Sequence, residues 1–265
     1  METGVWVALI ASVTSLIVAG ISLHFQRKGA KEEREEKQRS DAKVVLDKYR
    51  GPLLAAASDL GYRIDHIRHD KFLIYTAPES GRDQQAKLTT LFRFAQYFGW
   101  REILRTEVQL LRFEREADTK LVAALIGDID WAFGSDMLHD GPCGMLWAEE
   151  QRGIGELMVA ESDSSPSTHC GYARFVREYD KSFASWMDSL AGFALGEKAT
   201  SSDRLRLVQW ALLGLVKELD EEHAHTDEIW MDRAWEELKK YPVPESPREE
   251  SSIRSHVSQA GAHGA

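Results

Sequence analysis

Three clusters of polar residues have the types and spacing that chemistry requires. The first comprises Glu149, Glu150 and Glu156, in a segment with helical apolar spacing. The apolar stripe of this segment, which includes Trp147 and Ile154, runs through Glu150. A carboxylate on an apolar face must be paired, protonated or functional, so these glutamates are the candidate catalytic residues. The alternative is a structural ion pair with one of three arginines, Arg101, Arg105 and Arg152.

The second cluster is a histidine pair with a neighbouring carboxylate. His66 and His69 are three residues apart, which places them on one face of a helix, and Asp70 follows directly. The three side chains are candidate metal ligands, with Asp70 either as the third ligand or as the group that orients a ring. The alternative is a solvated helix end, where a cationic histidine is favoured by the helix dipole.

The third cluster contains Asp128, Asp130, Asp136 and His139. Residues two apart on a helix point to different faces, so the two aspartates at 128 and 130 make a poor metal site if this segment is helical. A solvated face is the interpretation that we adopt. The sequence contains none of the standard motifs for nucleotide, zinc, calcium or acyl-transfer chemistry. No cofactor is therefore predicted.

Seven amphipathic helices are predicted to position these clusters. Apolar residues recur at helical spacing over residues 52–67, 88–111, 122–133, 145–161, 172–195, 205–219 and 226–240. Pro52 suits the first turn of the first of these helices, and Ser202 or Asp203 caps the sixth. Gly99 marks a kink or a close helix crossing in the second helix. Only the sequence FLIY at 72–75 suggests a strand, so we predict an all-α body.

Three sequence blocks in this body resemble a family of proteins. They are YRGPLLAAASDLGYRI at 49–64, FAQYFGWREILRTEVQLL at 94–111 and EEQRGIGELM at 149–158. In this order they are similar to an uncharacterised bacterial family of single-span membrane proteins with a helical cytoplasmic domain. The resemblance covers roughly residues 50–215. It implies no activity and no functional residues.

Residues 5–25 form an uninterrupted apolar segment without Asp, Glu, Lys or Arg. A helix of this length is roughly 30 Å long, the thickness of the hydrocarbon core of a bilayer. We predict one transmembrane helix; a cleaved signal peptide is the alternative. Basic residues follow the segment at Arg27, Lys28 and Lys31, and none precedes it. The positive-inside rule therefore predicts a plasma-membrane protein with its N-terminus outside and its body in the cytoplasm.

Small residues recur every fourth position within this segment, at Ala11, Ser15 and Ala19. This spacing lets two membrane helices approach closely, so these residues are candidate contacts in a homo-oligomer. Ordinary transmembrane composition is the alternative. Crosslinking of cysteines placed at these positions distinguishes the two.

Charge divides the chain of 265 residues, whose formal net charge is −10. The stretch 27–50 carries an excess of basic residues and is expected to form a helical spacer beside the bilayer. Residues 51–265 contain 24 basic and 36 acidic side chains, a net charge of −12, which argues against a nucleic-acid partner. The expected organisation is an anchor at 1–26, this spacer, a helical domain at 51–241 and a disordered tail at 242–265.

These observations favour a membrane-tethered interaction module over an enzyme. Residues 51–241 are expected to bind a protein partner at the inner face of the membrane, as a scaffold, sensor or regulator. The alternative is a membrane-bound enzyme with a carboxylate or metal site inside the bundle. Trp230 and Trp235 are possible contact residues, although burial in the core is the more frequent fate of tryptophan. Cys143 and Cys170 are expected to remain reduced in the cytoplasm.

Overall fold

The computed structural model describes residues 47–109, 117–160, 168–220 and 229–241, together with single positions between 28 and 44. The predicted membrane span at 5–25, with Ala11, Ser15 and Ala19, lies outside the described residues, as does the predicted disordered tail at 242–265. Among the helices that are described, none is both long and apolar enough to cross a bilayer.

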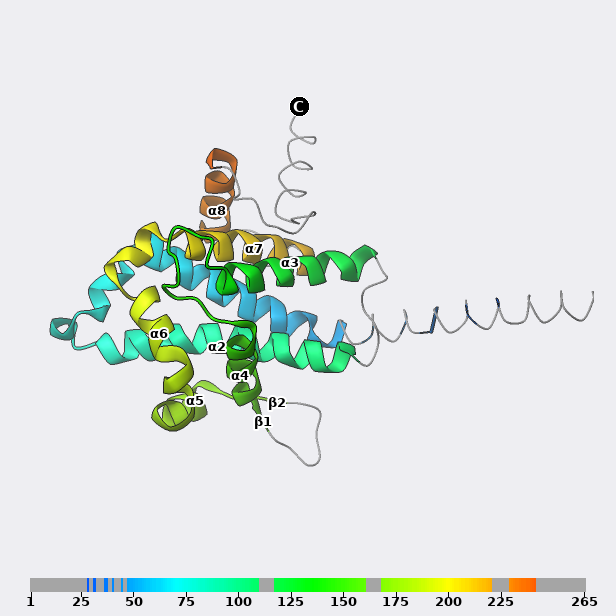
Figure 1. Cartoon of the computed structure of the whole chain (residues 1–265), viewed down its shortest axis with the longest axis horizontal. Coiled ribbons are helices and arrows are strands. Elements are labelled where there is room, and N and C mark those ends of the chain that lie inside the picture. Colours follow the sequence, from blue (N-terminus) through cyan, green and yellow to red (C-terminus); the bar gives the residue numbers. More distant parts are fainter. Residues whose placement is uncertain are drawn as a thin grey trace, which may run out of the picture.

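The described part of the chain is an all-α bundle, as predicted, with one additional pair of two-residue strands (Figure 1). In chain order its elements are a helix over 47–69, the 3-10 helices η1 (Phe72–Thr76) and η2 (Pro78–Ser80), α2 (Asp83–Gln109), α3 (Ala117–Gly134), α4 (Ala148–Met158), β1 (Val159–Ala160), β2 (Thr168–His169), α5 (Tyr172–Glu178), the π-helix η4 (Tyr179–Phe183), α6 (Ala184–Ala194), the 3-10 helix η5 (Glu197–Ser201), α7 (Asp203–Leu219) and α8 (Ile229–Lys240). Each predicted amphipathic helix has a counterpart in this order.

The helix over 47–69 and α2 form an antiparallel hairpin, which η1 and η2 close at one end of the molecule (Figure 1). The prediction that a helix begins at Pro52 is wrong, because the helix runs without a break from residue 47. Proline removes one backbone hydrogen bond to the carbonyl of Lys48, a residue that is exposed to water. Tyr49 is buried in the core and Arg50 donates from Nε to the carbonyl of Leu219, at 2.9 Å, so tertiary contacts keep the preceding turn in place.

The FLIY segment is not a strand but most of the 3-10 helix η1. Strand formation requires a partner for the backbone groups, and the described strands β1 and β2 pair only with each other. Lys71, immediately before η1, adopts a left-handed conformation with φ of 56°. This residue turns the chain sharply out of the 47–69 helix and into η1.

α2 and α4 cross at two glycines, Gly99 and Gly155. A Cβ atom on Gly155 would lie 2.7 Å from the carbonyl oxygen of Phe98, and one on Gly99 would lie 2.7 Å from Cβ of Met158. Contacts this short are excluded for any larger residue without movement of the helices. The close crossing predicted at Gly99 is therefore present, and α2 continues through it as one helix.

The predicted helix over 172–195 is present as three consecutive segments, α5, the π-helix η4 and α6. A π-helix inserts an extra residue into the helical register, and such insertions occur frequently at functional sites. Phe175, Tyr179 and Phe183 still point into the core. The change of register lies at Tyr179 and Asp180, on the side of the bundle that faces the first turns of α2.

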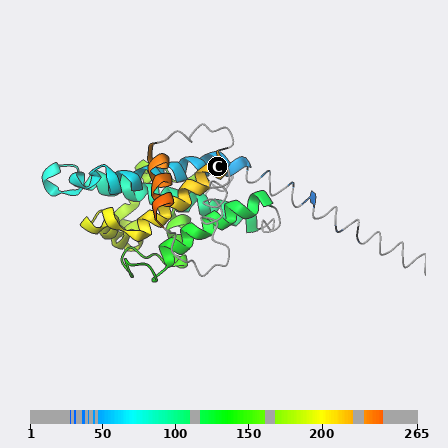
Figure 2. The ribbon, with the colours of Figure 1, turned by 90° about the horizontal axis from the view of Figure 1, so that it is seen from above.

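α7 is the most deeply buried helix of the described bundle, and α8 packs over it (Figure 2). Ser202 caps α7, as predicted, by accepting a hydrogen bond from the backbone N–H of Leu205 at 3.1 Å. The ring of Trp230 fills the space above Gly61, where a Cβ would lie 2.5 Å from the ring. Trp235 is half-buried against the core, so both tryptophans of α8 serve mainly in packing.

Candidate functional site

The structure places the three candidate glutamates at the surface of α4. Glu149 and Glu156 are exposed, and Glu150 is half-buried. Glu150 accepts a hydrogen bond from the backbone N–H of Trp147 at 2.7 Å, which satisfies the first turn of the helix. Trp147 is itself 61% exposed, so the stripe that we drew through Glu150 does not face the core at this end. These three residues therefore do not form a carboxylate site inside the bundle.

A different carboxylate is buried beside α4. Glu102 of α2 is 3% exposed and forms a two-point ion pair with Arg105, one turn away. Arg101 pairs instead with Asp130 of α3, with 2.5 Å between Nη2 and Oδ2. Gln151 donates from Nε2 to the carbonyl oxygens of Asp130 and Leu146. Two of the three arginines offered to Glu150 thus have other partners: Arg101 joins α2 to α3 and Arg105 covers Glu102. The third, Arg152, is exposed on α4.

His66 and His69 do not converge on a common point. His66 lies 3.4 Å from Asp70 and packs against the ring of Tyr62. His69 has different partners, with Nδ1 2.9 Å from Asp65 and Nε2 3.3 Å from Glu237 of α8. Among the described residues, no group of three or more His, Cys, Asp or Glu side chains is arranged to hold a metal ion. The metal hypothesis for this cluster is not supported.

His69 belongs to a wider network of side chains, six of which we call the α8 clamp. The clamp joins the 47–69 helix to α7 and α8 and contains Asp65, Arg68, His69, Gln209, Arg233 and Glu237. Arg233 of the clamp also pairs with Asp70, at 2.8 Å. Arg68 binds Glu237 through both guanidinium nitrogens, at 2.8 and 2.9 Å. Asp65 is 1% exposed and accepts hydrogen bonds from His69, Gln209 and Arg233.

Protonation states in the α8 clamp are fixed over a wide pH range. The hydrogen bond to Asp65, with that to Glu237, raises the pKa of His69 to about 9. Burial opposes ionisation of both carboxyls. The hydrogen bonds and charges of His69 and Arg233 nevertheless hold the pKa of Asp65 below its ordinary value, and those of His69 and Arg68 hold the pKa of Glu237 at about 2. His69 is therefore protonated, and Asp65 and Glu237 are ionised, at neutral pH, and these opposite charges hold the 47–69 helix against α8.

The third candidate cluster is dispersed. Asp128 is buried, Asp130 pairs with Arg101, and Asp136 is exposed. The side chain of His139 is 97% exposed and approaches Asp203 at 2.8 Å. The interpretation of this cluster as a solvated face is therefore wrong for Asp128, which the packing of α3 buries. Asp128 and Asp130 lie two residues apart in a helix, as the poor metal geometry requires, and the four residues form no common site.

Arg204 is the most completely satisfied polar side chain that the structure describes. It is fully buried at the start of α7, and all five of its N–H groups donate to backbone carbonyls, those of Ala132, Phe133, Ser135, Gly141 and Cys143. Burial lowers its pKa below the ordinary value for arginine. The side chain fixes the loop between α3 and α4, which borders a cavity of about 730 Å³ that also contains the exposed thiol of Cys143.

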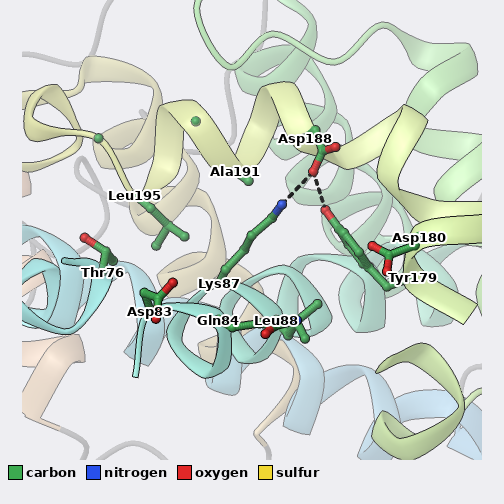
Figure 3. Close-up of a pocket in the computed structure, with 12 residues that line it drawn as sticks. Thr76, Asp83, Gln84, Lys87, Leu88, Tyr179, Asp180, Asp188, Ala191 and Leu195 are labelled. Atoms are coloured by element: carbon green, nitrogen blue, oxygen red, sulfur yellow. Dashed lines mark hydrogen bonds and ion pairs between the residues drawn. The ribbon is translucent and has the colours of Figure 1, made fainter. Parts of the chain in front are cut away.

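A second cavity, of about 680 Å³, lies between the start of α2 and the helix formed by η4 and α6 (Figure 3). We call it the α2–α6 cleft. Residues from η1, α2, η4, α6 and the two positions after α6 line it: Thr76, Asp83, Gln84, Lys87, Leu88, Tyr179, Asp180, Asp188, Ala191, Gly192, Leu195 and Gly196. Leu88, Ala191 and Leu195 supply an apolar wall, and three aspartates and one lysine supply charge. Its volume falls in the range of ligand pockets, about 300–1,000 Å³.

Three polar side chains meet at one oxygen in this cleft. Asp188 Oδ1 accepts a hydrogen bond from Lys87 Nζ at 2.8 Å and another from the Tyr179 hydroxyl at 2.8 Å (Figure 3). The ammonium of Lys87 also lies 5.1 Å from the centre of the Tyr179 ring. Unlike Asp65 of the α8 clamp, the acceptor of this group faces water: the Asp188 side chain is 56% exposed, and that of Lys87 is 38% exposed.

The chemistry of this group suits binding rather than proton transfer. The hydrogen bonds from Lys87 and Tyr179 lower the pKa of Asp188, and burial together with the bond to Asp188 raises the pKa of Tyr179. Asp188 is therefore ionised and Tyr179 protonated throughout the neutral range, and general acid–base catalysis requires a group that titrates there. The cleft presents fixed charges and an apolar wall.

Sequence reasoning missed the cleft. Lys87 and Asp188 are 101 residues apart, so no local spacing links them. In the sequence, Tyr179 is one member of the apolar stripe over residues 172–195, and this position indicates a core residue. The π-helix η4 shifts the helical register by one residue, and the apolar stripe of the sequence shows no gap at this position.

Comparison with known proteins gives no relative from which a function can be transferred. No protein-family model, no curated protein and no solved structure matches the chain. The resemblance of the three sequence blocks to a bacterial membrane-protein family therefore stays a prediction.

Proposed function

We propose that the chain is a membrane-tethered interaction module whose acidic helical body binds a protein partner at the inner face of the membrane. The α2–α6 cleft carries this proposal. It is open, it is lined by three aspartates and one lysine beside an apolar wall, and at neutral pH Asp188 is ionised and Tyr179 is protonated. The apolar segment at 5–25 and the basic residues that follow it supply the tether.

The structure offers little to the alternative of a membrane-bound enzyme. The glutamates expected to carry the chemistry, Glu149 and Glu156, are exposed on α4. Catalytic carboxylates usually occupy sites that change their pKa through burial or neighbouring charge. A scaffold, sensor or regulator requires only a surface that recognises its partner.

Site-specific photocrosslinking in intact cells tests the proposal. A photoreactive amino acid replaces Gln84, an exposed residue at the edge of the cleft, in the full-length chain. The matched control places it at Asp59, an exposed residue of the 47–69 helix that does not line the cleft. We expect a discrete crosslinked species from position 84 in the membrane fraction and none from position 59. The same products from both positions, or none from either, would refute the proposal.

A further inference from the structure

We infer that the α2–α6 cleft takes an arginine or lysine side chain from the partner, next to a bulky apolar residue that contacts Ile74 and Tyr75. This inference rests on the proposed function and specifies the chemistry of the partner segment. It depends on the charges within the cleft, on the exposed apolar surface beside it and on the fixed shape of both.

The first support is an excess of negative charge in the cleft. Lys87 and Asp188 balance each other, which leaves Asp83 at the start of α2 and Asp180 in η4. Both aspartates are exposed, and within the described ranges neither forms an ion pair. Asp188 uses only Oδ1 for Lys87 and Tyr179, so Oδ2 is available to a donor.

These carboxylates define the group that fits. An arginine carries five N–H donors in a planar arrangement that matches carboxylate oxygens, and a lysine carries three. Asp83 of α2 and Asp180 of η4 line the same cavity toward its two ends, with Lys87 between them (Figure 3). A cationic side chain that enters the cleft at either end meets a carboxylate without an ion-pair partner among the described residues. An anionic side chain would meet like charge at both ends.

The second support is an exposed apolar surface at the rim. Ile74 is 60% exposed and Tyr75 is 48% exposed, and both lie in η1 directly before Thr76, which lines the cleft. Exposure of a large apolar side chain to water is unfavourable, so a partner that covers Ile74 and Tyr75 gains free energy from their burial. The partner segment therefore needs an apolar residue close to its cation.

The third support is that the rim is held in place before binding. The Ser80 hydroxyl donates to the carbonyl of Tyr75 at 2.9 Å, and Thr76 Oγ1 donates to the carbonyl of Leu73 at 2.8 Å. The ring of Phe72 packs under the guanidinium of Arg63, at 4.1 Å. A preorganised surface binds more tightly because fewer groups must be ordered on association.

A peptide selection tests the inference. A library of random-sequence peptides is displayed and selected on the full-length chain in nanodiscs of zwitterionic lipid, after counterselection on empty nanodiscs. The same selection is performed on the double variant Asp83→Asn/Asp180→Asn and on the control Asp59→Asn, which removes the same kind of charge outside the cleft. We expect peptides with Arg or Lys next to a bulky apolar residue to be enriched on the native chain and on the control.

The selected peptides then report on each part of the surface. Affinity should fall about fivefold to tenfold on the double variant, and the difference should shrink at high salt. The variant Ile74→Ser/Tyr75→Ser should weaken binding by a similar factor without changing the salt dependence. Enrichment of acidic or uncharged peptides, equal binding to the double variant and the control, or no enrichment at all would overturn the inference. A partner crosslinked from position 84 that binds the double variant normally would leave the proposed function intact and remove the cationic group from it.

Discussion

Asp65 and Asp188 have similar partners and opposite surroundings. Asp65, in the α8 clamp, accepts hydrogen bonds from His69, Gln209 and Arg233, and its side chain is 2% exposed. Asp188, in the α2–α6 cleft, accepts hydrogen bonds from Lys87 and Tyr179, and its side chain is 56% exposed. The chemical groups alone do not distinguish a structural network from a binding site.

Burial makes the difference. A charge removed from water is costly unless every partner remains, so loss of one partner in a buried network destabilises the protein strongly. An ion pair in water contributes little to folding, because water and salt replace it. The buried polar side chains Arg204 and Gln209 thus lie on α7, and the exposed pair of Lys87 and Asp188 joins α2 to α6. The predictions below test this division, from the largest expected effect to the smallest.

Replacement of Arg204 should cause the largest loss of stability, because this side chain is fully buried. Arg204→Met leaves five backbone carbonyls without their donor in the interior, and we expect a loss of about 3–5 kcal/mol in the free energy of unfolding. Urea unfolding of the full chain, followed by tryptophan fluorescence, measures it. The matched control is Arg206→Met, two residues further along α7, where the half-buried side chain pairs with Asp203. Equal stability of the two variants would contradict the structural role of Arg204.

Substitution in the α8 clamp should have the next largest effect. Asp65→Asn keeps the shape but removes the charge that faces His69 and Arg233, and we expect a loss of about 2–3 kcal/mol. The control Asp59→Asn, on the exposed face of the same helix, should change stability by less than about 0.5 kcal/mol. If Asp65→Asn were as mild as the control, the clamp would not hold α8.

The clamp should also respond to alkaline pH. His69 has a raised pKa in the folded protein, so its contribution is fully present below the ordinary value of 6.5 and is lost as the pH rises through about 9. The free energy of unfolding should therefore decrease over this interval, as determined by urea titrations at successive pH values. The variant His69→Gln should show a flatter profile over the same interval. A native profile that is already flat there would mean that His69 does not gain its proton from the clamp.

The exposed pair of Lys87 and Asp188 should matter least for folding. Asp188→Asn removes an exposed ion pair, and we expect the free energy of unfolding to change by less than about 0.5 kcal/mol. Binding of the selected peptides should nevertheless weaken, because the cleft loses a carboxylate. A large loss of stability would place Asp188 with the α8 clamp rather than with a binding site.

Local sequence patterns predicted the helices well because the core is periodic. The stripes over 122–133 and 205–219 correspond to α3 and α7, and the cap at Ser202 follows from a hydroxyl before an apolar run. Pro52 and FLIY were misread for one reason. Tyr49 packs in the core and Arg50 binds the carbonyl of Leu219, and in the described part of the chain β1 and β2 pair only with each other and not with residues 72–75. These relations between distant residues are not visible in the local sequence.

The polar sites were predicted less well than the helices. Spacing placed Glu150 on an apolar stripe, but the stripe begins at Trp147, which the bundle leaves exposed. The pairs that matter join residues from different helices, such as Lys87 with Asp188 and Arg68 with Glu237. Side chains more than a hundred positions apart meet only through the packing of the whole bundle.

Carboxyl footprinting tests most directly the claim that the cleft is a binding site while the clamp is structural. Purified full-length chain and native membranes are labelled with a carbodiimide and an amine, and the modification of each aspartate is followed by mass spectrometry. We predict that Asp65 resists labelling in both samples. Asp83, Asp180 and Asp188 should be labelled in the purified chain and protected in native membranes, whereas Asp59 should be labelled equally in both. Equal labelling of the cleft aspartates in the two samples would contradict the account.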